Sequence, residues 1–123
     1  MRAIKNSHEV EQALADVGFT IVDPAEHARP ELLFMNADVI VGAHGAGLAD
    51  IAFSRPGTIL VEIIPSDHVY PYYYNLAGAA GLKYSYVYAN SIKNRKKGSL
   101  GPSPYDLVVD VPNLLGLISR IDQ

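Results

Sequence analysis

Three glycines and a histidine fall within the short segment Gly42-Ala43-His44-Gly45-Ala46-Gly47. This segment follows the apolar run "DVIVG" and precedes a helix-forming run from Leu48 to Phe53. Backbone N–H groups at the start of such a helix attract anions, because the helix dipole also favours negative charge there. Glycine lets the backbone approach a ligand closely. The order of strand, glycine loop and helix therefore indicates an anion site, most often for phosphate, although a purely structural turn has the same composition.

His44 favours the binding interpretation, because a tight glycine turn has no packing need for an imidazole. An imidazole can donate a hydrogen bond to a phosphate oxygen, or act as an acid or base near neutral pH. His44 is therefore the candidate catalytic residue. The spacing G-x-H-G-x-G matches neither the dinucleotide fingerprint nor the P-loop. His8, His27 and His68 form no metal motif with acids, so we expect neither a metal site nor a cofactor.

Glu62 is a carboxylate in the apolar strand "LVEII", near the carboxyl end of that strand. A carboxylate in this position must lie at the sheet rim or have a partner, because burial of an unpaired charge is costly. A position at the rim places Glu62 beside the glycine loop, where carboxylates commonly bind sugar hydroxyls. An ion pair with Arg55 or a lysine is the structural alternative.

The pattern of apolar residues predicts helices that alternate with strands along the chain. Asn6 and Glu9 have the spacing of a reciprocal helix cap at the start of the first helix. The predicted helices are Ser7 to Val17, Pro30 to Asn36, Leu48 to Phe53, Val69 to Ala80 and Pro112 to Ile121. The predicted strands are Phe19 to Asp23, Asp38 to Gly42, Thr58 to Ile63, Lys83 to Ala89 and "YDLVVDV", and Asn90 to Pro104 is predicted to be an exposed basic loop.

This alternation predicts an α/β fold with a Rossmann-like, doubly wound and mostly parallel sheet. The 123 residues suit one domain, residues 1–123. Ligands in this fold class bind beyond the carboxyl ends of the strands, where the glycine loop is expected.

The composition narrows the classes of partner. A net charge of -3 gives no general attraction to nucleic acid, and the absence of cysteine excludes disulfides. The apolar runs are far shorter than the roughly 20 residues that span a bilayer, and the N-terminus lacks the apolar stretch of a signal peptide. We therefore expect a cytoplasmic chain that is not transmembrane and binds a small molecule or a protein.

Two segments resemble glycosyltransferase family 61, namely "RAIKNSHEVEQALADVGFTIVDP" and "NADVIVGAHGAGLADIAFSRPGTILVEI". This family includes bacterial capsular polysaccharide biosynthesis proteins and eukaryotic transferases that act on proteins and on xylan. The resemblance covers roughly Arg2 to Leu82. It implies the C-terminal half of a GT-B type enzyme, which inverts the anomeric centre and holds the nucleotide-sugar donor mainly with that half. The implied function is nucleotide-sugar binding in polysaccharide or capsule biosynthesis, with no bound metal required.

The resemblance also assigns roles to residues of the glycine loop, which begins at Gly42. It places the donor diphosphate on the amides of Gly45, Ala46 and Gly47, with His44 beside it. Glu62 would lie near the ribose. Arg2 and Asn6 match the basic and capping positions of the family.

Two departures support an alternative function. Asp50 stands where the family usually carries asparagine, and a carboxylate in the first helical turn should repel phosphate. The length corresponds to the C-terminal half alone, so we expect the isolated chain to be inactive and to need a separate acceptor-binding domain or chain. The alternative is a non-catalytic nucleotide-binding or assembly module that kept the fold without transferase activity.

We also predict a homodimer, because a sheet that lacks the first strand of the family exposes an edge or an apolar flank. The segment Tyr70 to Tyr74 is the candidate contact, since aromatic residues are enriched in interface cores. Light scattering at micromolar concentration should give a mass near twice the 13.3 kDa of the chain. A monomeric mass that stays constant as the sample is concentrated would contradict this prediction.

Overall fold

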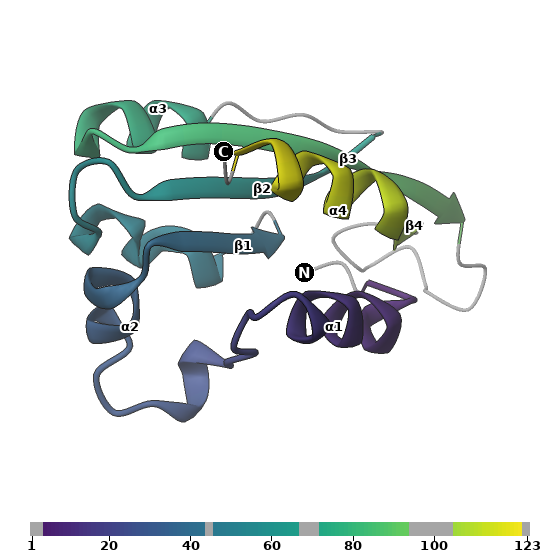
Figure 1. Cartoon of the computed structure of the whole chain (residues 1–123), viewed down its shortest axis with the longest axis horizontal. Coiled ribbons are helices and arrows are strands. Elements are labelled where there is room, and N and C mark those ends of the chain that lie inside the picture. The colour runs from purple at the N-terminus through teal and green to yellow at the C-terminus, as the bar shows by residue number, and fades with distance from the viewer. Residues whose placement is uncertain (1–3, 44–45, 67–71, 94–104, 122–123) are drawn as a thin grey trace. The chain divides into compact units, whose positions relative to one another are not determined.

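The computed structural model describes residues 4–43, 46–66, 72–93 and 105–121 (Figure 1). The chain divides into two compact units. Unit 1 comprises Met1–Ile21, Pro65–Asp67 and Tyr88–Gln123, and unit 2 comprises Val22–Ile64 and His68–Val87. Strand β3 (Lys83–Lys93) contributes its first part to unit 2 and its second part to unit 1.

Unit 2 is built on two parallel strands, β1 (Val39–Ala43) and β2 (Ile59–Pro65). Their register runs from Val39 opposite Ile59 to Ala43 opposite Ile63, and Figure 1 shows the two strands side by side. β2 is buried from Leu60 onward, as is typical of a parallel strand that is covered on both faces. The other elements of the unit are the short 3₁₀ helix η1 (Pro24–Glu26), α2 (Glu31–Asn36), the 3₁₀ helix η2 (Ala46–Phe53) and α3 (Tyr72–Ala80).

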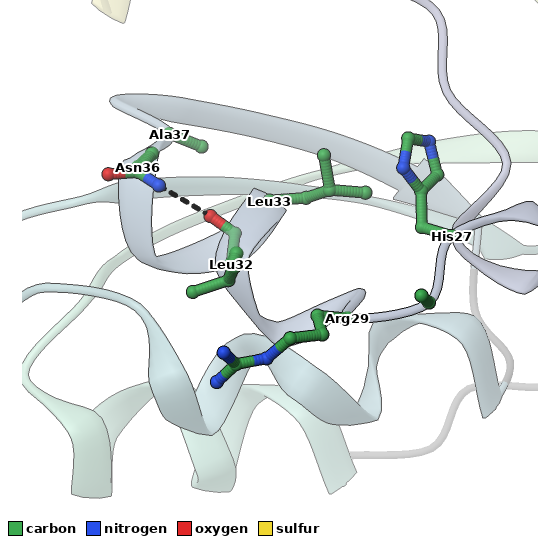
Figure 2. A pocket seen from close by; sticks show the side chains of 7 residues that line it. His27, Arg29, Leu32, Leu33, Asn36 and Ala37 are labelled. Atoms are coloured by element: carbon green, nitrogen blue, oxygen red, sulfur yellow. Dashed lines mark hydrogen bonds between the residues drawn. The ribbon is translucent and has the colours of Figure 1, made fainter.

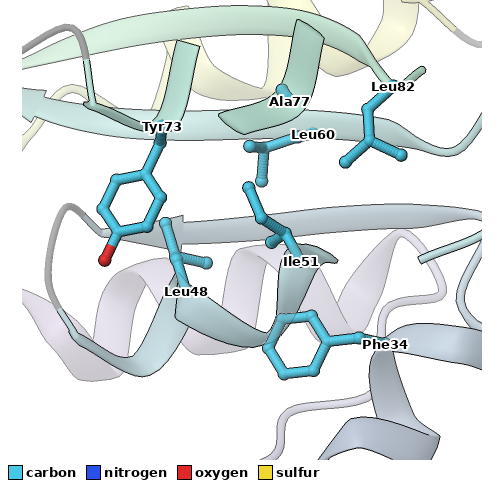
Figure 3. Close-up of a cluster of buried hydrophobic side chains, with 7 residues drawn as sticks. All are labelled: Phe34, Leu48, Ile51, Leu60, Tyr73, Ala77 and Leu82. Carbon is cyan, nitrogen blue, oxygen red and sulfur yellow. The ribbon is translucent and has the colours of Figure 1, made fainter. Parts of the chain in front are cut away.

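The core of unit 2 gathers apolar side chains from its helices around β2 (Figure 3). Ile51, Leu60 and Ala77 are completely buried in it. Burial of an aliphatic side chain of the size of leucine or isoleucine stabilises a fold by about 1.5–3 kcal/mol. This cluster therefore fixes α2, η2 and α3 relative to β2, and its buried members are Phe34, Leu48, Ile51, Leu60, Tyr73, Ala77 and Leu82.

Unit 1 consists of α1 (Ser7–Asp16), the second part of β3, β4 (Tyr105–Val109) and α4 (Val111–Ile121). β3 and β4 are antiparallel, with Ala89 opposite Val109 and Lys93 opposite Tyr105. The two helices contact each other, and each buries residues spaced four apart on one face. These residues are Val10 and Leu14 on α1, and Leu114 and Ile118 on α4.

Asn6 does not cap α1 with its side chain, so the predicted reciprocal cap with Glu9 is wrong. The Asn6 side chain instead donates from Nδ2 to the Val109 carbonyl at 2.8 Å and accepts from the Val109 N–H at 3.0 Å. The preceding residues already pair with β4, since the Lys5 N–H donates to the Leu107 carbonyl at 2.7 Å. A side-chain amide has the donor and acceptor of a peptide group. Asn6 therefore continues the pairing with β4 after the backbone has turned into α1.

One predicted strand and one predicted boundary are also wrong. Phe19 to Asp23 is not a strand, because no described residue pairs with this segment in a β-ladder. Its side chains Ile21 and Val22 are 44% and 45% exposed. The predicted loop from Asn90 to Pro104 begins too early, since β3 continues to Lys93 through its pairing with β4. The rest of that loop, residues 94–104, lies outside the described residues.

The remaining predicted elements are confirmed within a few residues where the structure describes them. Gly81 ends α3 with a φ of 77°, a left-handed conformation that favours glycine. Tyr70, the first residue of the predicted dimer contact, lies outside the described residues.

The fold is a mixed α/β arrangement with a four-stranded sheet in the order β1-β2-β3-β4. A doubly wound sheet requires a reversal of strand order. The described strands run in chain order without such a reversal, so the structure does not confirm the Rossmann-like, doubly wound arrangement. In the part of the chain that the structure describes, no helix combines the length and the apolarity needed to cross a bilayer.

The bridge from Asn6 to Val109 predicts a measurable contribution to stability. Asn6→Ala removes both hydrogen bonds, and we expect the free energy of unfolding to fall by about 1–3 kcal/mol because half-buried polar groups lose their partners. Gln12→Ala is the matched control on the same helix, since its amide bonds the exposed Asp16 side chain. It should change the free energy by less than about 0.5 kcal/mol. Urea unfolding followed by circular dichroism measures both, and equal losses would contradict the bridging role.

Candidate functional site

The candidate site begins where β1 ends. β1 stops at Ala43 and η2 starts at Ala46, so the predicted order of strand, short loop and helix is confirmed. η2 is a 3₁₀ helix, a form that is common in short helical segments. His44 and Gly45 lie outside the described residues, and the structure does not describe the side chains of Ala46, Gly47 and Asp50. The binding roles of the loop therefore stay predictions.

Gly42 has a packing role that its sequence context did not reveal. A Cβ atom at this position would lie 2.5 Å from Cδ2 of Leu48, which is closer than real Cβ contacts. Leu48 belongs to the core of unit 2 and is only 5% exposed. The absence of a side chain at Gly42 thus lets η2 pack Leu48 against the end of β1. The structural interpretation of the loop accounts for Gly42.

Glu62 lies opposite Gly42, the first residue of the glycine loop, in the register of β1 and β2. The predicted rim position is wrong, because β2 continues to Pro65 and Glu62 is 0% exposed. The Tyr84 hydroxyl donates to Glu62 Oε1 at 2.5 Å, a distance typical of hydroxyl–carboxylate bonds. Arg55, the predicted ion-pair partner, instead pairs through Nη2 with Asp38 Oδ1 at 2.7 Å. A contact between Glu62 and a ribose stays a prediction.

The sequence analysis missed Tyr84 as a residue of this site. The signal was present in "KYSYVYA", where tyrosines alternate with other residues along the predicted strand. Alternate residues of a strand share one face of the sheet. The alternation could therefore have placed Tyr84 on one face of β3, but only the register between strands shows which carboxylate it meets.

A surface pocket of about 490 Å³ lies on another part of unit 2 (Figure 2). It contains none of the predicted site residues. Two of its polar side chains are already engaged, because Arg29 Nε donates to Glu31 at 3.1 Å and the Asn36 amide donates to the Leu32 carbonyl at 2.9 Å. These bonds hold the two side chains in place along the wall of the pocket. Its lining residues are His27, Ala28, Arg29, Leu32, Leu33, Asn36 and Ala37.

The charge beside this pocket is balanced locally. A backbone hydrogen bond, followed by the hydrogen bond from Arg29, holds the pKa of the Glu31 carboxyl below its usual value. Because Arg29 and Glu31 neutralise each other, they give the pocket no strong attraction for an anion. Among the described residues, no group of three or more histidine or acidic side chains could hold a metal ion.

Among known proteins, residues 1–61 match the family described as Glycosyltransferase 61. A 57-residue segment is also 42% identical to a β-1,2-xylosyltransferase of Arabidopsis thaliana. Over the matched residues the chain belongs to glycosyltransferase family 61. The match to the xylosyltransferase covers 46% of this chain and 11% of the length of that relative.

The family 61 segment contains the glycine loop but stops short of the buried carboxylate. The profile ends at Val61, the residue before Glu62, and it includes α1, α2, β1 and η2. The loop between β1 and η2 therefore lies within the residues that family 61 matches. Glu62 and Tyr84 lie beyond the match, and only the structure links them to the loop.

The packing role of Gly42 in this family 61 segment can be tested by adding a side chain at this position. Gly42→Ala should lower the free energy of unfolding by about 1–3 kcal/mol, because overpacking displaces Leu48 or the backbone. Gly78→Ala is the matched control, since a Cβ there meets open space in α3. It should leave the free energy unchanged or raise it by about 0.5–1 kcal/mol. In a Leu48→Ala background, Gly42→Ala should cost less, and strictly additive losses in urea unfolding would contradict the clash.

Proposed function

We propose that this chain supplies the nucleotide-sugar-binding part of an inverting, GT-B type glycosyltransferase that acts in polysaccharide biosynthesis. The observation that carries the proposal is the strand, loop and helix formed by β1, residues 44–45 and η2, within the residues matched by family 61. A doubly wound arrangement of the sheet, with ligands at the carboxyl ends of its strands, belongs to the same proposal.

In this proposal the loop binds the diphosphate of the donor. The amides of Gly45, Ala46 and Gly47 face the phosphate oxygens at the start of η2, where helix N–H groups have no partner within the helix. His44 donates a further hydrogen bond to the same group. These interactions strengthen as the bond between the sugar and the diphosphate breaks and negative charge grows on the leaving group.

The transfer itself needs groups beyond the donor site. An acceptor hydroxyl forms a bond to the anomeric carbon as the diphosphate leaves, and a base removes the proton from that hydroxyl. We propose that this base and part of the acceptor contacts come from a separate acceptor-binding domain or chain. His44 remains the candidate catalytic residue in the chain itself.

Two features favour the alternative, a non-catalytic nucleotide-binding or assembly module. Glu62 is completely buried, so a ribose could reach its carboxylate only if the surrounding side chains moved. Under this alternative Glu62 has a structural role through Tyr84. Asp50 also favours the alternative, because its carboxylate lies close in the sequence to the proposed phosphate site and should repel a phosphate.

Titration with uridine and guanosine diphosphates, followed by amide NMR shifts, tests the proposal. We expect the largest shifts at Gly45, Ala46 and Gly47. His44→Ala should weaken binding by about 10- to 100-fold, because a hydrogen bond to a charged group is lost. His27→Ala is the matched control, an exposed histidine outside the loop, and should leave the Kd unchanged.

Asp50→Asn adds a second arm to this titration. It removes a negative charge near the proposed phosphate site, so the diphosphate should bind more tightly at low salt, and less so when salt screens the charge. Shifts confined to residues outside 42–50 would contradict the proposed site. Absence of binding by either diphosphate would favour the assembly module.

A further inference from the structure

Three tyrosines of unit 2, Tyr74 on α3 and Tyr84 and Tyr86 on β3, form a continuous row that we call the tyrosine row. The ring centroids of Tyr74 and Tyr84 are 5.4 Å apart with an interplanar angle of 82°. Those of Tyr84 and Tyr86 are 6.3 Å apart with an angle of 33°. These are the separations of interacting aromatic pairs. The three rings therefore form one contiguous aromatic cluster, in which the Tyr74 and Tyr84 rings meet edge to face and the Tyr84 and Tyr86 rings are tilted relative to each other.

The outer rings of this row are exposed and the middle ring is anchored. Tyr74 is 60% exposed and Tyr86 is 50% exposed, whereas Tyr73 on the same helix is 4% exposed and belongs to the core. Tyr84 packs against the core cluster and donates its hydroxyl to the buried Glu62. A ring held by both its apolar body and its hydroxyl has little freedom left to lose when a ligand binds. The middle of the row is thus preorganised.

We infer that the tyrosine row binds the sugar rings of a neutral acceptor glycan; the choice of this ligand rests on the proposed glycosyl transfer. A pyranose ring presents a flat face of C–H groups with hydroxyls at its edge. A tyrosine ring offers a flat apolar face with a hydroxyl at its tip, so both parts of the sugar find matching groups. Tyrosine is uncharged at neutral pH, which suits a neutral glycan better than a phosphate.

The outer tyrosines are the residues to replace. Removal of the Tyr84 hydroxyl would take a hydrogen bond from a buried carboxylate and could unfold the chain. Tyr74→Ala and Tyr86→Ala change exposed side chains, and unchanged thermal unfolding verifies that each variant is folded. Phe53→Ala is the matched control, because Phe53 is an aromatic residue of unit 2 that is 54% exposed and outside the row.

The experiment titrates the chain with xylohexaose, cellohexaose and mannohexaose. Saturation-transfer NMR detects binding, and tyrosine fluorescence gives a second signal that no tryptophan masks, because the chain contains none. Three of the eight tyrosines belong to the row, so the fluorescence change that is lost in Tyr74→Ala and Tyr86→Ala is the part assigned to the row. We expect at least one hexasaccharide to bind at millimolar concentration. Tyr74→Ala and Tyr86→Ala should each weaken that binding about five- to tenfold, as expected for loss of a stacking contact. Phe53→Ala should have no effect.

Three outcomes would overturn the inference. The first is that none of the hexasaccharides binds, or that binding is insensitive to both tyrosine variants. The second is that the variants weaken binding of uridine or guanosine diphosphate, which would make the row a surface for the nucleobase. The third is that they abolish a dimer seen by light scattering while sugars fail to bind. Failure of the diphosphates to bind the glycine loop would remove the proposed donor role but would leave the hexasaccharide result to stand by itself.

Discussion

Glu62 is a completely buried carboxylate in β2, a strand that is buried from Leu60 onward. Burial of a carboxylate lowers the stability of a fold unless the group is hydrogen-bonded. The hydroxyl of Tyr84 provides a hydrogen bond from the neighbouring strand β3. The bond thereby constrains the alignment of β3 with β2 and the orientation of the Tyr84 ring. Because Gly42 is the register partner of Glu62, the same part of β2 also adjoins the end of β1 from which the glycine loop departs. The proposed donor site and the tyrosine row both depend on this arrangement.

Gly42 shows that structural and binding interpretations of a glycine loop need not exclude each other. Its missing side chain makes room for Leu48, which anchors η2 in the core. A helix that is anchored in the core loses less conformational entropy when its first N–H groups bind an anion. The packing of Leu48 thus supports the proposed use of the next amides in the loop, although Gly42 itself is explained by packing.

The family match and the structure contribute different parts of the argument. The match to glycosyltransferase family 61 ends at Val61 and gives the glycine loop its chemical context. The structure extends this context to residues that the match does not include, because β2 and β3 bring Glu62 and Tyr84 together. The pocket beside α2 is a contrasting case. It has volume, but its arginine and asparagine side chains already bond within the chain.

Local sequence determined most of the helices and strands. The run "DVIVG", the run "TILVEI" and the α1 pattern of Val10 and Leu14 each carry their own periodicity, so β1, β2 and α1 were predictable within a few residues. The order of strand, glycine loop and helix was predictable for the same reason. The prediction of a strand from Phe19 to Asp23 was wrong, because strand propensity alone does not supply a neighbouring strand to pair with. The described chain provides no such strand beside this segment.

Tertiary structure alone decided which distant residues meet. Asn6 has the local spacing of a helix cap, yet its amide bonds Val109, because the N-terminal segment lies along β4 and a side-chain amide can replace a peptide group there. Glu62 was recognisable from sequence as a carboxylate that required a partner, but its hydroxyl donor, Tyr84, comes from another strand and Arg55 pairs with Asp38. Sequence spacing therefore determined which groups needed partners, whereas strand register determined the partners, because register is a long-range property that local periodicity does not encode.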